Sequence, residues 1–120
     1  MQDWPFDDLT SAVASLSSPE FVDVRGYVLR ISRQWTAESL QTWIASGSRV
    51  AAIEDVLNHL HLWDELDTDG LDDVQLRRAS EAIAESWRAE LKREFPERQF
   101  RVVVTDDYGP GVTCSSENTA

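Results

Sequence analysis

Apolar residues recur three or four positions apart through most of this chain, which is the spacing of one face of an α-helix. The pattern predicts helices over residues 5–16, 36–47 and 48–64, and a fourth from Leu71 or Asp72 to about Phe95. Thr36 is placed to cap the second helix and Gly47 to end it, while Pro96 stops the last one. Each of these helices has an apolar face that needs a partner.

Two other segments have a strand-like pattern. Residues 100–105, FRVVVT, are rich in β-branched side chains, and the turn sequence DDYGPG separates them from a short return strand, VTC. A hairpin alone is marginal in water, so it needs a third strand or burial against helices. Residues 21–32, FVDVRGYVLRIS, supply that strand, because Gly26 costs a helix interior about 1 kcal/mol relative to alanine. Their apolar spacing also matches a helix, which stays the alternative.

The length of the chain limits the architecture. Its 120 residues are enough for one core and too few for two. We predict one globular domain over residues 1–115 and a flexible tail over residues 116–120. The predicted class is α+β, with a small antiparallel sheet of one N-terminal strand plus the C-terminal hairpin, covered by three to four helices. A mainly α domain with a C-terminal β-hairpin is the alternative.

The charge of the chain is strongly negative and unevenly distributed. Its 22 Asp and Glu against 11 Lys and Arg give a net charge of −11, which repels phosphate backbones and anionic membranes. No Lys or Arg occurs between Arg49 and Arg77, where eight acidic residues fall. No apolar run approaches the roughly 20 residues that span a bilayer. We therefore expect a basic protein as partner, with no direct contact to nucleic acid and no membrane insertion.

Cys114 is the only cysteine, which excludes an internal disulfide and a zinc site built on several cysteines. The N-terminal residues have no basic and apolar signal pattern, so a reducing, cytoplasmic location is expected. As a nucleophile, Cys114 lacks the surrounding sequence of any family of Cys and His enzymes. We assign no catalytic residue.

The segment NHLHLWDELDTDGLDD, residues 58–73, raises the question of a metal site. On a regular helix, residues two apart point about 160° away from each other, so His59 and His61 are expected to diverge. His61 and Glu65 have the usable spacing of four, but zinc needs a further protein ligand. No metal ligand and no cofactor are assigned here. A metal-dependent or His/carboxylate acid-base enzyme, using His59 or His61 with the acidic loop, is kept as the alternative function.

Residues 65–76, ELDTDGLDDVQL, resemble the calcium loop of EF-hand proteins. The resemblance rests on Asp67, Asp69, Gly70 and Asp73, which match ligand and glycine positions of that loop. The chain departs from the loop at Glu65, at Asp72 and at Leu76, which replaces the bidentate glutamate. We predict an ordinary turn in which Gly70 has a positive φ and an aspartate caps the next helix, and leave cation binding open.

The remaining hypothesis is a binding surface. An acidic patch steers a basic partner, and exposed tryptophans anchor interfaces. Trp43, Trp63 and Trp87 fall on apolar helix faces and are predicted in the core. The predicted partner-binding residues are Asp64, Glu65, Asp67, Asp69, Asp72 and Asp73, with Trp4 and Trp35 as exposed aromatics. The expected function is stoichiometric binding of a basic protein, as by an immunity protein, an antitoxin, a nucleic-acid mimic or an adaptor, and a homodimer is a further alternative.

Overall fold

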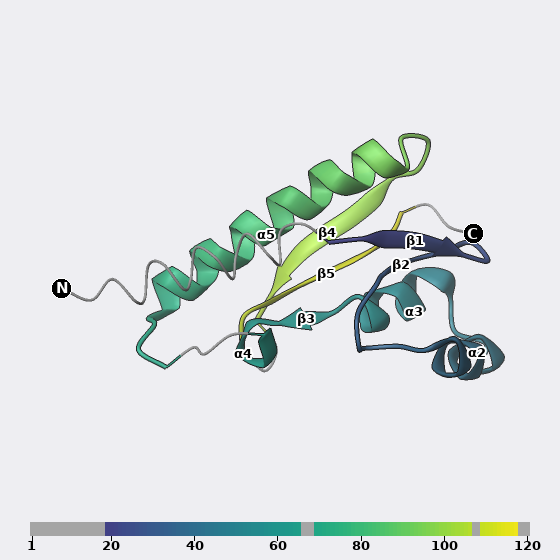
Figure 1. Cartoon of the computed structure of the whole chain (residues 1–120), viewed down its shortest axis with the longest axis horizontal. Coiled ribbons are helices and arrows are strands. Elements are labelled where there is room, and N and C mark those ends of the chain that lie inside the picture. The colour runs from purple at the N-terminus through teal and green to yellow at the C-terminus, as the bar shows by residue number, and fades with distance from the viewer. Residues whose placement is uncertain (1–18, 66–68, 107–108, 118–120) are drawn as a thin grey trace.

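The computed structural model describes residues 19–65, 69–106 and 109–117 (Figure 1). The predicted helix over residues 5–16, with Trp4 and Asp67, lies outside the described residues. The elements are β1 (Phe21–Val24), β2 (Tyr27–Arg30), α2 (Ala37–Ala45), α3 (Val50–Leu57), β3 (Leu60–His61), α4 (Leu62–Glu65), α5 (Asp73–Glu94), β4 (Phe100–Thr105) and β5 (Gly111–Ser116). Helices and small antiparallel sheets together confirm the α+β class. Within the described residues, no helix is long and apolar enough to cross a membrane.

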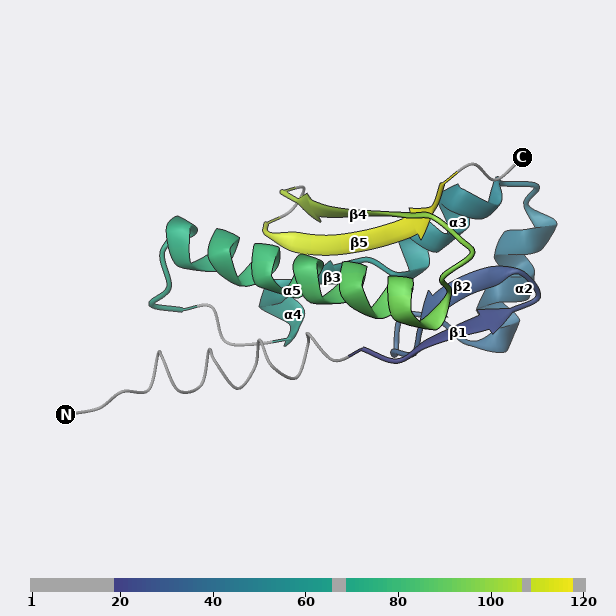
Figure 2. The same ribbon diagram turned by 90° about the horizontal axis from the view of Figure 1, so that it is seen from above.

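The long helix α5 lies along a three-stranded sheet of order β3-β5-β4 (Figures 1 and 2). Asp72 begins the helix with a capping box, in which its Oδ1 accepts from Gln75 N at 2.8 Å and Gln75 Oε1 accepts from Asp72 N at 2.9 Å. The apolar stripe of α5 faces the sheet, where Ile83 and Trp87 are fully buried. The predicted fourth helix and its aspartate cap are confirmed.

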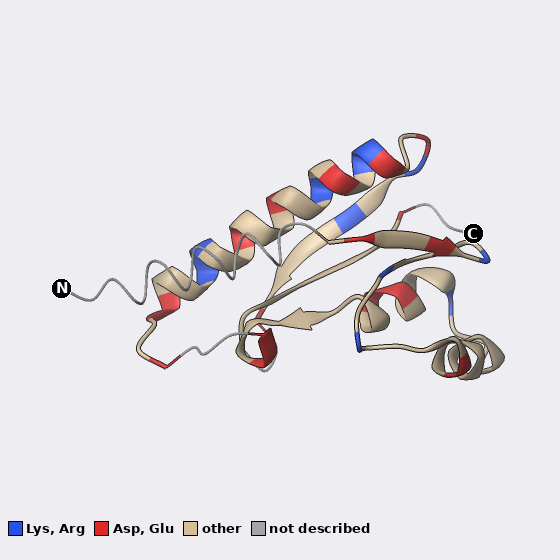
Figure 3. Cartoon of the chain, viewed as in Figure 1, with Lys and Arg blue, Asp and Glu red and all other residues tan. Residues whose placement is uncertain are grey.

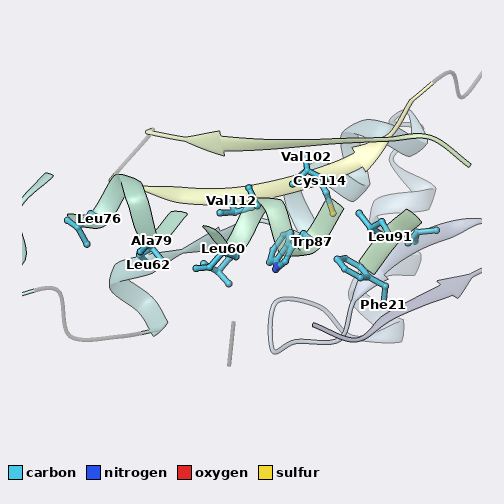
Figure 4. Packing of buried hydrophobic residues seen from close by; sticks show 13 residues of the cluster. Phe21, Leu60, Leu62, Leu76, Ala79, Trp87, Leu91, Val102, Val112 and Cys114 are labelled. Carbon is cyan, nitrogen blue, oxygen red and sulfur yellow. The ribbon is translucent and has the colours of Figure 1, made fainter. Parts of the chain in front are cut away.

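Figure 4 shows the core between α5 and this sheet. Side chains from seven elements meet there, among them Leu60, Leu62, Leu76, Val102, Val112 and Cys114. Phe21, at the start of β1, packs edge-on against Trp87 with ring centroids 5.8 Å apart. Since Phe21 belongs to a different sheet, this contact joins the N-terminal strands to the main core.

The segment predicted as one strand over residues 21–32 forms a hairpin of its own. β1 and β2 pair from Phe21 with Arg30 to Val24 with Tyr27, apart from the other sheet. The turn between them places Arg25 at φ 57° and Gly26 at φ 93°, the left-handed backbone that tight hairpin turns require. Strand structure is thus confirmed for these residues. The prediction that they join the C-terminal hairpin is wrong, because the turn at Gly26 folds the segment back on itself.

The helix predicted over residues 48–64 is also wrong beyond Leu57. After the C-cap Asn58, the chain extends, and Leu60 and His61 pair with Val112 and Gly111 of β5. Only a single turn, α4, follows. An unpaired edge of β5 supplies backbone partners that outweigh the apolar helical spacing of these residues. Gly111 permits the approach, since a Cβ there would collide with the carbonyl oxygen of Leu60.

A second apolar cluster lies under the hairpin, between β2, α2 and α3. Leu29, Leu40, Ile53 and Leu57 are buried in it. The prediction of a helix between Thr36 and Gly47 is confirmed by α2, in which Thr36 forms a capping box with Ser39. This cluster is smaller than the core beneath α5, so further interactions hold the two parts together.

Two buried polar side chains make those interactions, Glu54 of α3 and its C-cap Asn58. Glu54 accepts hydrogen bonds from Val28 N (2.8 Å) and, with its other oxygen, from Ser116 N (2.7 Å). Asn58, one turn later, accepts from Arg30 N at 2.7 Å and donates to the carbonyl oxygens of Val28 (3.1 Å) and Cys114 (3.2 Å). Both side chains are fully buried. Their hydrogen bonds therefore connect β2 to β5, which belong to two separate sheets.

Candidate functional site

A row of three aromatic rings runs from β3 to α4. The ring centroids of His59 and His61 are 4.3 Å apart, and those of His61 and Trp63 are 5.2 Å apart with the planes at 26°. The expectation that the two histidines diverge is therefore wrong. It assumed a helix, whereas in an extended segment residues two apart lie on the same side. His59 Nε2 is 2.9 Å from Thr105 Oγ1, a hydrogen bond that fixes the row against β4.

Trp63 is the last ring of this row and is half exposed. It was predicted in the core, but 51 % of its surface is accessible, because the helix on whose apolar face it was placed ends before it. The indole packs over Gly109, where an added Cβ would lie 3.0 Å from Trp63 Cδ1. The ring is thus held by His61 on one side and by the β4–β5 connection, while half of it faces solvent.

Acidic residues lie in α4, which contains Trp63, and at the start of α5 (Figure 3). Asp64 and Glu65 follow Trp63 in α4 and are exposed, and Gly109 lines a cavity of about 300 Å³ together with Asp73, Asp106 and one basic residue, Arg77. We define the Trp63 surface as these five residues: Trp63, Asp64, Glu65, Asp73 and Asp106. Asp69 and Asp72 are also exposed, near the start of α5. The described acids among the predicted partner-binding residues are therefore exposed, whereas Glu54, from the same acidic stretch of sequence, is fully buried.

Trp35, which was predicted with Trp4 as an exposed aromatic, is not freely exposed. It is half-buried against the second apolar cluster, and its Nε1 donates to the carbonyl oxygen of Arg30 at 2.7 Å. The expectation placed it outside any helix face and so in solvent. The loop after β2 instead folds back over α2 and α3, which covers the indole. Trp87 is in the core as predicted, and Trp43 packs partly against the second cluster.

A pocket of about 460 Å³ lies between the end of β2 and α4. We call it the Arg30 pocket, and its lining residues are Arg30, Ser32, Arg33, Gln34, Asp64 and Glu65. Residues 50–76 contain eight acidic residues and no Lys or Arg. In the fold, however, Arg30 and Arg33 line the same pocket as Asp64 and Glu65.

Arg30 is the buried residue of this pocket. Only 9 % of its surface is exposed, its Nε has no hydrogen-bond partner, and its Cζ lies 5.4 Å from the centroid of the Trp87 ring. Burial lowers the pKa of Arg30, while the charge of Glu65 opposes that change. No sequence signal separates Arg30 from the exposed Arg25 in the same hairpin, so pattern reasoning missed it.

The alternative of a metal-dependent or His/carboxylate enzyme rests on His59, His61 and the acidic loop, whose Asp67 lies outside the described residues. Across residues 19–65, 69–106 and 109–117, no three His, Cys, Asp or Glu side chains gather in a metal-binding group. Asp64 and Glu65 line the Arg30 pocket, which neither histidine lines. Burial, with a smaller effect of Glu54, raises the pKa of the Cys114 thiol far above its ordinary value, which disfavours the thiolate that a nucleophile requires.

No protein-family model matches this chain, and no curated protein or solved structure is similar enough to indicate a relationship. Functional inference therefore depends on the two sites themselves, the Trp63 surface and the Arg30 pocket.

Proposed function

We propose that this protein acts by stoichiometric binding of a basic protein, through the Trp63 surface. The observation that carries the proposal is a half-exposed indole, held by His61 and Gly109, next to exposed carboxylates. Aromatic anchors of this kind contribute much of the energy of protein interfaces, and a rim of charge directs the encounter.

The chemistry of the surface indicates which partner group it takes. The face of an indole attracts a guanidinium or ammonium ion, and a neighbouring carboxylate forms an ion pair with the same group. Arginine suits both contacts, because its planar guanidinium stacks on the ring while its N–H groups donate to carboxylate oxygens. We infer that an arginine of the partner stacks on Trp63 and pairs with Asp64 or Asp73.

The net charge of −11 supports the same proposal at longer range. A strongly acidic protein attracts a basic partner over about 8 Å at physiological ionic strength, which accelerates association. Neither a membrane surface nor a nucleic-acid backbone benefits from this field.

The test compares captured proteins across variants. Wild-type protein, Trp63→Ala and the double variant Asp73→Lys with Asp106→Lys are used as bait in native lysate of the source cells, and bound proteins are quantified by mass spectrometry. We expect one basic protein to be bound by wild type, and to be reduced about tenfold or more with either variant. Raising the salt from about 0.1 M to 1 M should also weaken its capture.

A matched control carries the same change of charge elsewhere. Glu94 and Glu97 are exposed at the far end of α5, so Glu94→Lys with Glu97→Lys reverses two charges at a distance from Trp63. The control should retain the partner. A partner retained by Trp63→Ala, or lost equally with the control, would contradict the proposal.

A further inference from the structure

The Arg30 pocket has charges of both signs on its walls, and Nε of its most buried charged side chain, Arg30, has no acceptor among the described residues. We propose that this pocket binds a free α-amino acid, whose carboxylate contacts Arg30 and Arg33 and whose ammonium group contacts Asp64 and Glu65. This inference concerns a different ligand from the basic protein, and the Arg30 pocket shares Asp64 and Glu65 with the Trp63 surface.

Arg30 is largely removed from water. Only 9 % of the Arg30 surface is exposed, so its guanidinium loses part of its hydration, and this loss is costly unless hydrogen bonds replace the water. Arg30 Nε has no such bond, and no ion pair within 4.0 Å among the described residues includes Arg30. A carboxylate would accept two parallel hydrogen bonds from the planar guanidinium and supply the missing acceptor.

The position of Arg30 is fixed in advance of any ligand. Its backbone N–H donates to Asn58 at 2.7 Å, its carbonyl oxygen accepts from Trp35 at 2.7 Å, and its guanidinium lies over the ring of Trp87. Gln34, on the adjoining wall, donates through its side chain to the carbonyl oxygen of His59. A ligand therefore loses little binding energy to the ordering of these groups.

The mixed charge of the walls selects the kind of ligand. A simple anion would meet the carboxylates of Asp64 and Glu65, and a simple cation would meet the two arginines. An α-amino acid carries both charges one carbon apart and satisfies both walls. The cavity of about 460 Å³ has room for the backbone atoms and a side chain of the ligand.

The first experiment measures binding by isothermal titration calorimetry. The probes are L-alanine, L-glutamate, L-lysine and L-phenylalanine, followed by the amide and the N-acetyl derivative of the tightest of them. We expect saturable binding with one site per chain for at least one amino acid. Each derivative lacks one charge of the zwitterion, so both should bind about 10- to 100-fold more weakly.

The second experiment locates the site with exposed residues that the fold does not need. Arg33→Gln and Asp64→Asn remove one charge from each wall, and each should weaken binding of that amino acid about tenfold while leaving the unfolding midpoint unchanged. The control is Arg101→Gln, which removes an exposed arginine on β4 and should leave binding unchanged. Arg30→Lys keeps the positive charge without the planar donor pair, and binding should also fall.

Three results would overturn the proposal. The first is no binding of any probe at up to about 10 mM, tenfold above a millimolar dissociation constant. The second is equal affinity for the acid and its amide or N-acetyl derivative, and the third is undiminished binding by Arg33→Gln and Asp64→Asn. If Glu65 served only as an internal counter-ion of Arg30, Glu65→Gln would lower the stability and no probe would bind, which also counts against the site.

Discussion

The two halves of the molecule satisfy their buried groups in different ways. The α5 half, consisting of α5 with β3, β4 and β5, is organised around apolar side chains such as Ile83 and Trp87. The hairpin half, consisting of β1, β2, α2 and α3, has a small apolar cluster, and Glu54 and Asn58 join it to the other half in addition to the contact of Phe21 with Trp87. Hydrophobic burial stabilises the α5 half. The join to the hairpin half depends on buried hydrogen bonds, which are favourable only when every buried polar group has a partner.

The two halves should differ in how much stability they lose when a buried side chain is substituted. An apolar core loses stability in proportion to the atoms removed, since neighbouring side chains relax into part of the space. A buried polar group has no such graded response, because one missing partner leaves the others desolvated and unpaired. We therefore expect small changes to be more harmful at the join than beneath α5.

The largest loss is expected for Glu54→Ala. The substitution leaves Val28 N, Ser116 N and Ser116 Oγ without an acceptor, and removes the carboxylate that lies 3.9 Å from Arg98. Unfolding by urea should show a decrease of about 3–5 kcal/mol in the free energy of unfolding.

Glu54→Gln is the control for volume. Glutamine has nearly the same shape but turns an N–H group toward a backbone donor, so we expect a loss of about 1–3 kcal/mol. If Glu54→Ala cost less than about 1 kcal/mol, the join would not depend on these hydrogen bonds, and the contrast between the halves would disappear.

In the α5 half, the polar side chain with the largest effect on stability is expected to be Asp72, the N-cap of α5. Asp72→Ala removes the acceptor of Gln75 N and should lower the free energy of unfolding by about 0.5–2 kcal/mol, measured by urea unfolding. Asp72→Asn, which caps a helix about equally well, should retain nearly all of it. Equal losses for the alanine and asparagine variants would point to the charge rather than the cap.

A small apolar change beneath α5 should be mild. Ile83→Val removes one methylene from a fully buried side chain, for which a loss of about 0.5–1.5 kcal/mol is expected by the same measurement. Set beside Glu54→Gln, it compares two changes of similar size in the two halves. A larger loss for Ile83→Val than for Glu54→Gln would reverse the order of tolerance.

The same contrast explains how much could be predicted from the sequence. The helix α5 and its cap were predicted because its apolar period is long and regular and Asp72 directly precedes it. The segment around Leu60 was misread as helix, since its apolar spacing fits one and only the edge of β5 decides otherwise. Trp63 and Arg30 were missed for a related reason. Their exposure and burial depend on contacts with β5, α4 and Trp87, which are distant in sequence.

The smallest effect is expected at Cys114, which is buried where the two halves meet. Because burial raises the pKa of the thiol in the folded state, the folded protein keeps this proton where the unfolded chain releases it. The contribution to stability is therefore complete below the unfolded pKa of about 8.5 and declines as the pH rises above it, by at most about 1.4 kcal/mol per pH unit.

The measurement is the difference in free energy of unfolding between wild type and Cys114→Ala from neutral to alkaline pH. The difference should be constant up to about pH 8 and then shift against wild type, whose unfolded chain alone gains a thiolate. In parallel, a thiol reagent should label wild type only when it unfolds, because the native thiol is buried and protonated. Rapid labelling of the native protein, or a pH-independent difference, would show that the junction between the halves opens to solvent.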